Sequence, residues 1–269
     1  MHNAKCAAMH LDVWSVKADW LHQTVDLIKS GIIPADADRA NRSYSVDDNS
    51  YEVADGIAII SMAGSLMKQW SKYGGTSTTW LRAAIRHADR NSAVKGIMLH
   101  IDSPGGTSAG TAELGDEVRR TSKPIYAHID DLGASAAYWV ASQADSISIN
   151  RAGFSGSIGT YAVIYDTSKQ AEMEGIKVHV LSTGAFKGSG EPGTEITEEQ
   201  LGEWQSVVDS HFEHFAAAVR SGRPALKAKA HFNAVADGRV FDAKSSLQNG
   251  LVDRVESFGT ALIRLRKSV

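Results

Sequence analysis

The sequence has few of the residues that cross-link a small domain or stiffen its backbone: one cysteine, Cys6, and five prolines in 269 residues. A single thiol excludes an internal disulfide and any zinc site built on several thiolates. No run of about 18 apolar residues occurs, and the first twenty residues lack the apolar core of a secretory signal, so no membrane anchor is predicted. Neither sign of charge dominates, because 28 Lys and Arg stand against 31 Asp and Glu. We therefore expect a cytoplasmic protein with no general attraction for nucleic acid.

What remains is an ordinary globular composition, 43% hydrophobic and 22% charged, in a chain long enough for one large domain. Residues 1–55 are interpreted as an N-terminal helical arm and linker, because apolar residues recur near helical spacing over 10–31 and a polar stretch follows. We assign 56–255 to the main domain and 256–269 to a C-terminal helix.

From residue 56 onward, short β-branched runs alternate with helical patterns. Strands are predicted at 56–64, 95–102, 123–130, 145–150, 160–166 and 176–183. Helices are predicted at 78–90, 108–122, 134–144, 167–175 and 196–222. This alternation indicates an α/β fold of repeated βαβ units with a largely parallel sheet, followed by a helical C-terminal part.

Two short motifs offer a catalytic serine, and each has a plainer explanation. Residues 106–110, GTSAG, match the nucleophile elbow G-x-S-x-G of α/β-hydrolases around Ser108, although a helix N-cap explains Ser108 better. Ser65 and Lys68 match S-x-x-K, but none of the companion motifs follows, so we interpret this match as coincidence.

Metal and nucleotide sites are also poorly supported. His211 and His214 share one face of a predicted helix, yet a third ligand is missing and two polar positions on an amphipathic helix explain them better. Gly153, Gly156 and Gly159 fit neither of the usual phosphate-loop spacings. No metal or organic cofactor is predicted.

Four loops at strand ends carry a more specific signal: 103–106, 132–139, 155–159 and 183–192. Loops at the carboxyl ends of parallel strands meet at one edge of a sheet. Within the second loop, Ser135 opens a predicted helix and is followed by Ala136 and Ala137. Unpaired amides at a helix start can stabilise a developing oxyanion, and the glycines of 103–106 can supply a second amide. The loops therefore favour acyl transfer at Ser135.

A serine nucleophile needs a base, and no histidine is well placed. His100 and His128 lie within predicted strands, where core or edge positions are the usual explanation. Lys187, in the fourth loop, can serve if burial keeps its amine neutral, and Ser157 can hold that amine. From composition alone, an exposed loop lysine is the simpler interpretation of Lys187.

These segments resemble a known family. Six segments occur in order between about Gly56 and Val255: IDSPGG, KPIYAHI, GASAAYWVAS, SGSIGTYAVIYD, STGAFKGSGEP and GRVFDAKSSLQNGLVDRV. Within them, Ser157 follows Ser135 by 22 residues and Lys187 follows it by 52. The series is similar to the S49-type serine peptidases, which include signal peptide peptidase A and the head-maturation proteases of tailed phages. These share the crotonase-like, Clp-protease-like fold.

The resemblance implies a Ser–Lys dyad. Ser135 would be the nucleophile, Lys187 the general base and Ser157 the residue that orients the lysine. The amides of Gly106 and Ala136 would form the oxyanion hole. Gly105, Gly156 and Gly159 are expected to bind substrate. The implied chemistry is peptide hydrolysis through an acyl-enzyme, without a cofactor. The implied assembly is a homo-oligomeric ring that completes the active site.

The sequence departs from the signal peptide peptidases at two points. Ala136 and Ala137 stand where many have Gly-Gly, and no membrane anchor is seen. The stretch GSGEPGTEITEEQ after Lys187 is closer to the phage branch. We therefore expect a polypeptide substrate, either phage or prophage scaffold and capsid proteins or small unfolded peptides, met in the host cytoplasm or a procapsid. Small or apolar side chains are expected near the scissile bond.

Two rival functions stay open. Crotonase-fold enzymes use the same paired amides on acyl-thioesters, and acyl-CoA binding that is indifferent to Ser135 would favour that chemistry. A silent assembly or scaffold component is the other rival. This function would be favoured if the wild type and the Ser135→Ala variant were equally inactive on unfolded substrates while both formed large assemblies.

Overall fold

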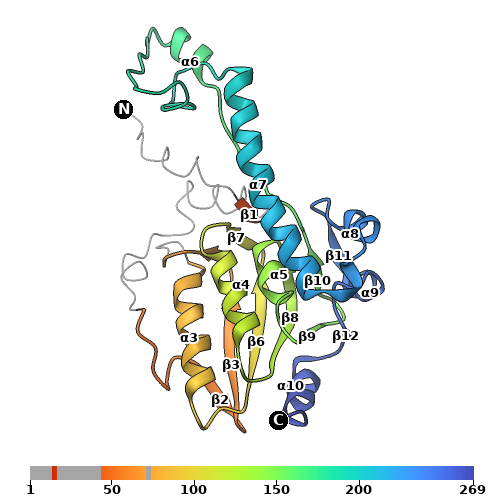
Figure 1. Cartoon of the computed structure of the whole chain (residues 1–269). Coiled ribbons are helices and arrows are strands. Elements are labelled where there is room, and N and C mark those ends of the chain that lie inside the picture. Colours follow the sequence, from red (N-terminus) through yellow and green to blue (C-terminus); the bar gives the residue numbers. More distant parts are fainter. Residues whose placement is uncertain (1–13, 17–43, 71–73) are drawn as a thin grey trace.

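A largely parallel sheet forms the centre of the computed structural model, which describes residues 14–16, 44–70 and 74–269 (Figure 1). Its strands β3, β6 and β8 lie side by side in parallel, while β2 and β11 close two edges in antiparallel pairing. The eight strands are β2 (Glu52–Ala54), β3 (Ile57–Ala63), β6 (Gly96–Ser103), β8 (Ile125–Ala134), β9 (Ser146–Ile149), β10 (Phe154–Gly156), β11 (Val240–Asp242) and β12 (Arg254–Val255).

Strand β8 makes the most strand pairings in this sheet, because two strands share one of its edges. Its first half pairs in parallel with β9, and its last residues pair in parallel with β10, where Ala134 lies opposite Gly156. On the other edge, Ser103 of β6 lies opposite Gly133. The carboxyl ends of β6, β8 and β10 therefore meet at one place.

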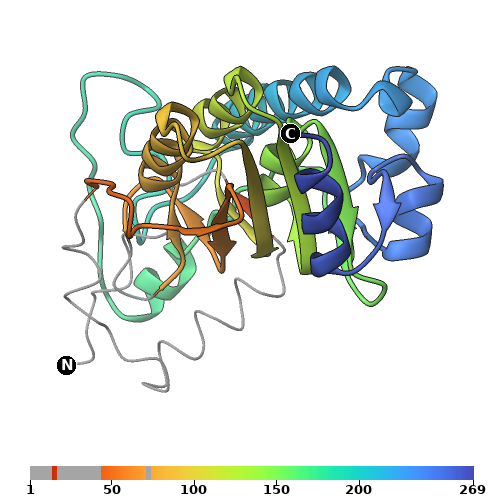
Figure 2. The same ribbon diagram turned by 90° about the horizontal axis from the view of Figure 1, so that it is seen from below.

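Helices cover both faces of the sheet (Figure 2). One face carries α3 (Thr78–Arg90), α4 (Thr111–Arg120) and α5 (Ala136–Ala141), and the other carries α10 (Phe258–Arg266). Helix α3 forms because Leu81, Ile85 and Ala88 recur at helical spacing and are buried, while Ser77 caps its start by accepting from the Trp80 N–H at 3.2 Å.

A smaller sheet extends beyond the carboxyl ends of β3 and β6. It contains β4 (Leu66–Met67), β5 (Thr76–Ser77), β7 (Gly105–Thr107) and β1 (Trp14–Val16), in the order β1-β7-β4-β5. Strand β7 follows β6 after a single residue, so the small sheet is attached directly to the place where the ends of the main strands meet.

The helix α7 (Glu198–Gly222) links the core to a projecting lobe, which we define as residues 165–197. A capping box between Thr197 and Gln200 starts the helix. Near its other end, the Phe215 ring stacks on Trp139 of α5 with centroids 4.9 Å apart. The first half of α7 extends away from the sheet together with α6 (Ser168–Met173) (Figure 1).

The C-terminal part returns to the sheet through η2 (Pro224–Leu226), α8 (Lys229–Val235) and α9 (Ala243–Gln248). An ion pair fixes this return: the buried Arg223 guanidinium donates to both carboxylate oxygens of Asp253, at 2.6 and 3.0 Å, and to the Gly250 carbonyl. The carboxylate in turn accepts from the Ile147 N–H in β9. The closing segment is thereby tied to the central sheet.

The α/β fold with a largely parallel sheet is confirmed, as are four of the six predicted strands and all five predicted helices. The strands predicted at 160–166 and 176–183 are wrong. Ile176, Val178 and Leu181 are exposed in the projecting lobe, where the described residues offer no partner strand, and β-branched runs form strands only with one. The predicted helix over 10–31 is wrong at Trp14–Val16, which is strand β1; its other residues lie outside the described part.

Candidate active site

Ser135 stands at a sharp turn between a strand and a helix. Strand β8 ends at Ala134 and α5 begins at Ala136, and Ser135 between them has φ 55° and ψ −122°. A positive φ is costly for a residue with a side chain, by about 1–3 kcal/mol, and is retained where the surroundings impose it. Here the Ser135 N–H donates to the Gly156 carbonyl at 2.7 Å and the Ser135 carbonyl accepts from Trp139 at 2.8 Å. The turn is therefore fixed from both sides.

The strained turn that a nucleophile elbow requires is thus found at Ser135 and not at Ser108. Three residues other than glycine have positive φ in the described part of the chain: Asp55, Ser135 and Ser157. Ser108 is not among them. Its predicted role as an N-cap is also wrong, because α4 begins one residue after Gly110, which takes the N-cap position without a side-chain bond.

The first amides of α5 are available beside Ser135. The first hydrogen bond of the helical type runs from Trp139 back to Ser135, so the Ala136 and Ala137 N–H groups precede the helix ladder. No acceptor for the Ala136 N–H is found among the described residues. Both alanines are fully buried, and Ser135 is only 1% exposed. The two alanine side chains are small. A developing oxyanion beside Ser135 could accept from the Ala136 amide.

Strand β7 brings Gly105 and Gly106 to the same end of β8. Ser103 connects the two strands: it lies opposite Gly133, its hydroxyl donates to the Gly64 carbonyl at 2.6 Å, and it accepts from the Gly105 N–H at 3.2 Å. At Gly106 a Cβ atom would lie 1.7 Å from the Leu66 carbonyl oxygen, so only glycine allows β4 and β7 to approach this closely. Helix α5 packs against β7, which places the predicted oxyanion glycine beside the helix that Ser135 opens.

Ser157 adjoins Ser135 on the other side, through β10. Gly156 lies opposite Ala134, and the next residue along each strand is Ser157 and Ser135 respectively. Ser157 also has a positive φ, 53°, and its N–H donates to the Arg239 carbonyl at 2.6 Å. Four of the predicted site residues, Ser135, Ala136, Gly156 and Ser157, are thereby brought together in one chain.

A cavity of about 380 Å³ opens beside Ser157. It lies between the segment that follows β10 and one face of α7; its lining includes Ser157, Gly159, Thr160, Tyr161, Val208 and Phe212. The Thr160 hydroxyl donates to the Val208 carbonyl at 2.9 Å and closes one wall. Burial raises the pKa of Tyr161 to about 12. Sequence reasoning included Gly159 but missed the α7 face, because no local motif marks it.

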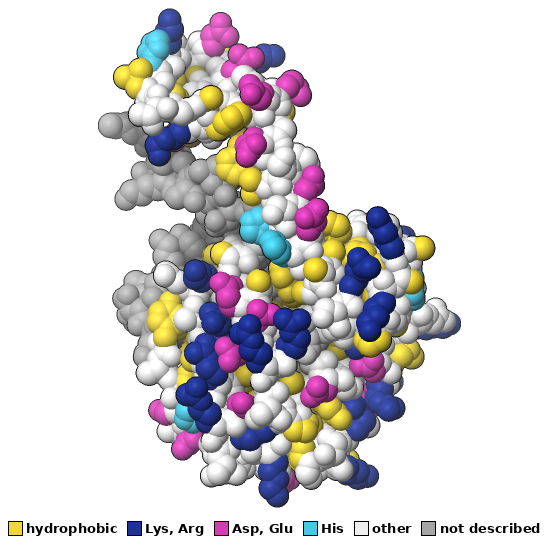
Figure 3. Space-filling view, viewed as in Figure 1, with side chains coloured by type: hydrophobic (Ala, Val, Ile, Leu, Met, Phe, Trp, Pro, Cys, Tyr) yellow, Lys and Arg dark blue, Asp and Glu magenta, His cyan; other side chains and the backbone are white. Residues whose placement is uncertain are grey.

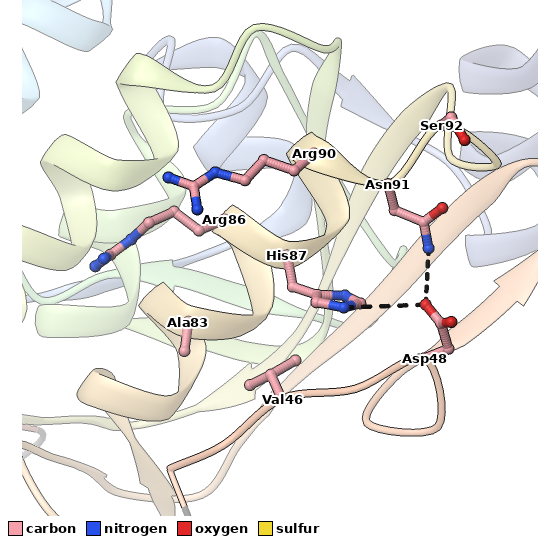
Figure 4. A pocket seen from close by; sticks show the side chains of 8 residues that line it. All are labelled: Val46, Asp48, Ala83, Arg86, His87, Arg90, Asn91 and Ser92. Atoms are coloured by element: carbon pink, nitrogen blue, oxygen red, sulfur yellow. Dashed lines mark hydrogen bonds and ion pairs between the residues drawn. The ribbon is translucent and has the colours of Figure 1, made fainter.

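A larger cavity, of about 600 Å³, is remote from these residues (Figure 4). It is lined by α3 and the segment before β2, with His87 between the Tyr51 hydroxyl at 2.7 Å and the Asp48 carboxylate at 4.0 Å. None of its lining residues belongs to the elements around Ser135. Size therefore does not identify the active site in this molecule.

Lys187 is not brought to Ser135 within one chain. It is exposed in the projecting lobe, and within the described structure its amine has no hydrogen bond or ion pair. Two residues further along, the Ser189 hydroxyl accepts from the Trp204 indole at 3.3 Å. Trp204 precedes Phe215 by eleven residues, about 16 Å along the α7 axis. The lobe that carries Lys187 is therefore held at the far part of α7 (Figure 1).

The histidines of the sheet are structural, as the sequence predicted. His128 is fully buried in β8, seven residues before Ser135, and its Nδ1 lies 2.9 Å from the Ser148 hydroxyl. Burial, with a smaller contribution from His100, lowers the pKa of His128 to about 4. Phe258 of α10 packs against both rings. Neither histidine can act as base at Ser135.

The remaining short motifs have structural explanations. Ser65 and Lys68 flank β4 rather than lying on a helix, so no helical turn separates them. Within the described residues, no group of three or more His, Cys, Asp and Glu side chains is arranged to hold a metal, His211 and His214 included. Among the helices of the described residues, none could serve as a membrane span.

Electrostatics at the carboxyl end of β6 adds one perturbed carboxylate near the site. Burial, followed by the charge of Asp131, raises the pKa of Asp102, which precedes Ser103. Burial and the neighbouring carboxylate therefore both disfavour the ionised form of Asp102.

Comparison with solved structures shows the fold. An enoyl-CoA hydratase from Shewanella pealeana superposes with a TM-score of 0.51 at 10% identity, over 81% of this chain and 73% of that one. The crotonase-like arrangement predicted from the sequence is thus confirmed.

Comparison with known sequences gives relatives that carry protease names. A protein of Enterococcus faecium named "Putative signal peptide peptidase SppA" is 31% identical over 189 residues, 68% of this chain and 54% of the relative. "Capsid assembly protease C" of Escherichia phage lambda is 25% identical over 256 residues, 91% of this chain and 58% of the relative. The chain thus spans little more than half the length of these relatives.

The family model of peptidase family S49 matches residues 117–269, a segment that contains Ser135, Ser157 and Lys187. The strand–turn–helix that carries Ser135 and the adjoining β10 lie inside it. The chain belongs to peptidase family S49.

Proposed function

We propose that the chain is a serine endopeptidase that works through a Ser–Lys dyad, with Ser135 as nucleophile and Lys187 as general base. The observation that carries this proposal is the fixed positive-φ turn at Ser135, between β8 and the free first amide of α5. A buried serine held in a strained turn beside a free amide is the arrangement that acyl transfer requires.

The reaction follows from these positions. The Ser135 hydroxyl attacks the substrate carbonyl and its proton passes to the neutral Lys187 amine, while the amides of Gly106 and Ala136 hold the oxyanion. The tetrahedral intermediate collapses as Lys187 returns the proton to the leaving amine. Water then repeats the cycle on the Ser135 ester and releases the acid. Ser157 orients the lysine amine, and Gly105, Gly156 and Gly159 border the substrate.

Lys187 is proposed to reach Ser135 of a neighbouring copy in a homo-oligomeric ring. The lobe that carries it exposes large apolar side chains (Figure 3). Leu181 is 96% exposed and Met173 82%. The other exposed ones are Tyr165, Ile176, Val178, Val180 and Phe186. Exposed apolar surface of this extent is typical of protein contacts. Burial in such a contact would also remove the lysine from water and favour its neutral form.

The substrate is proposed to be an unfolded or scaffold-type polypeptide. Two relatives with phage names support this choice, "Capsid assembly protease C" of phage lambda and "Head-tail preconnector protein GP5" of Enterobacteria phage P21. The small residues around Ser135 leave room for a main chain, and the cavity beside Ser157 offers space for a modest apolar side chain.

The proposal is tested by incubating casein with the wild type, Ser135→Ala and Lys187→Ala and identifying the cleaved peptides by mass spectrometry. Because both residues act on one proton transfer, either substitution should remove nearly all cleavage. Labelling with a fluorophosphonate checks the nucleophile independently of the substrate, and the label should map to Ser135. Cleavage that survives both substitutions would refute the dyad. A melting-temperature shift with acyl-CoA that Ser135→Ala leaves unchanged would instead support thioester chemistry.

A further inference from the structure

Strand β1 joins the N-terminal part of the chain to the active site. Its three residues pair antiparallel with β7, so that Trp14 lies opposite Thr107, Ser15 opposite Gly106 and Val16 opposite Gly105. The other edge of β7 pairs with β4, where Leu66 lies opposite Gly106. In the described part of the chain, β1 is thus the outermost strand of the small sheet and covers the edge of β7 (Figure 1).

The covered edge belongs to the strand next to the nucleophile. Gly106 is opposite Ser15, and α5, which begins directly after Ser135, packs against β7. The residues of β7 are buried, and two of the three are glycines without side chains. An extended main chain laid along this edge therefore passes beside the Ser135 turn.

Pairing of this kind is independent of side-chain identity. An added strand is held by main-chain hydrogen bonds, and the unpaired edge of a strand accepts any extended polypeptide with a compatible outline. We propose that the outer edge of β7 is the strand-addition surface for the polypeptide substrate, and that residues 14–16 of the same chain occupy it in the free protein. This inference rests on the proposed function, since it names how that same site takes its substrate.

The occupant competes with substrate in a defined way. A tethered segment is present at an effective concentration of about millimolar, whatever the protein concentration. Substrate binds only to the fraction of molecules in which β1 has left, so the apparent KM rises by the inverse of that fraction. The chemical step, which begins after β1 has left, keeps its rate constant. Release of the segment therefore lowers KM and leaves kcat unchanged.

A double proline variant tests the pairing without removing any residue. Ser15→Pro with Val16→Pro deletes two consecutive N–H groups, and because successive amides point to opposite sides of a strand, one of the two faces β7. Ser30→Pro with Gly31→Pro is the matched control in the same N-terminal part. Hydrogen exchange, followed by mass spectrometry in a Ser135→Ala background, reports on β7 whether or not the protein cleaves anything.

The expected result is faster exchange of the peptide containing Gly105–Thr107 in the 15/16 variant, but not in the control. Adding a synthetic peptide of residues 10–20 to the 15/16 variant should restore protection. Unchanged exchange at β7 would overturn the pairing. Failure of the added peptide to protect would overturn the edge as a strand-addition surface.

Kinetics on casein, with Ser135 intact, tests the competition. The 15/16 variant should show a KM at least about threefold below that of the wild type, with kcat unchanged and the control at the wild-type value. An unaltered KM together with faster exchange at β7 would refute competition with substrate. If no variant cleaves and none is labelled by fluorophosphonate, the proposed peptidase function fails, while the exchange experiment still decides whether β7 binds a polypeptide strand.

Discussion

The backbone N–H of Ser135 donates a 2.7 Å hydrogen bond to the carbonyl of Gly156, and this bond couples the strained turn after β8 to the end of β10. The same bond sets Ser157 beside Ser135, because Gly156 lies opposite Ala134 in the parallel pair. One main-chain contact thus positions both the proposed nucleophile and the residue proposed to orient its base.

Replacing Gly156 by alanine should damage the site more than the fold. Gly156 has φ 113°, and an added Cβ would lie 2.9 Å from the Arg239 carbonyl oxygen, so β10 must shift at its bond to Ser135. We expect the free energy of unfolding to fall by about 1–3 kcal/mol and kcat to fall at least about tenfold. Denaturant titration and casein cleavage measure the two effects.

The matched control is Gly56→Ala. Gly56 has a similarly positive φ of 80°, but its added Cβ would meet only the Lys95 side chain and the Ala93 carbonyl at ordinary contact distances of 3.6 Å and above. It should lose about 1 kcal/mol of stability and keep full activity. Equal activity in the two variants would contradict the role of the Gly156 bond.

The backbone strain at Ser135 predicts that activity and stability oppose each other there. Glycine adopts φ 55° without the steric cost that any side chain carries. Ser135→Gly should therefore exceed Ser135→Ala in free energy of unfolding by about 1 kcal/mol, even though both variants are inactive. Chemical denaturation of the two variants under the same conditions measures the difference. An alanine variant as stable as the glycine variant would mean that the turn is relaxed in solution.

The buried His128 predicts a loss of stability in acid. Its pKa is lowered to about 4, first by burial, from an ordinary value of 6.5. Between these two values the unfolded chain binds a proton that the folded chain does not, so protonation favours unfolding. The neutral, buried histidine thus contributes about 3 kcal/mol to the free energy of unfolding above pH 6.5, and this contribution is lost as the pH falls toward 4. The charged and titratable groups around the ring are His100, Asp130, Glu256 and Arg264.

The measurement compares unfolding free energies at pH 7 and pH 4.5 for the wild type and His128→Asn. Asparagine keeps a polar group near the Ser148 hydroxyl but does not titrate in this range. The decrease between the two pH values should be smaller in the variant by most of the His128 contribution. Parallel decreases in both proteins would show that other groups cause the acid loss.

Sequence patterns were sufficient for the elements and loops whose causes are local. The buried periodicity of Leu81, Ile85 and Ala88 predicts α3, and the order of the loops predicts that Ser135 and Ser157 meet at one edge of the sheet. The position of Lys187 was not predictable in this way. Its loop follows apolar β-branched residues that find no partner strand in the described chain, so periodicity indicated a strand where the lobe is extended and exposed.

Sequence patterns could not predict the pairing of β1 with β7 either. Trp14–Val16 lies in a stretch with helical spacing, and a three-residue strand forms there only because β7 offers an edge about ninety residues later in the chain. The turn at Ser135 has a related cause: its positive φ comes from the contact with Gly156, which follows it by 21 residues. Long-range contacts of this kind override local preference.

The apolar lobe should mediate assembly. Leu181→Asp places a charge on its most exposed apolar position and should lower the mass measured by light scattering toward that of a single chain. Ile263→Asp, at a half-exposed position on α10, is the control and should leave the mass unchanged. A mass insensitive to Leu181→Asp would exclude the lobe from the contact between copies.

Mixing two inactive variants tests whether Lys187 acts on a neighbouring copy. In Ser135→Ala the lysine is intact, and in Lys187→Ala the serine is intact. When the two chains are co-expressed in equal amounts and assemble at random, a site is complete if its serine comes from one and its neighbouring lysine from the other. About a quarter of the sites then regain activity. Casein cleavage by the co-purified mixture, compared with each variant alone, measures this recovery. Activity absent from the mixture, with mixed assemblies confirmed by native mass spectrometry, would place Lys187 and Ser135 of the same chain in one site and require the lobe to fold back along α7.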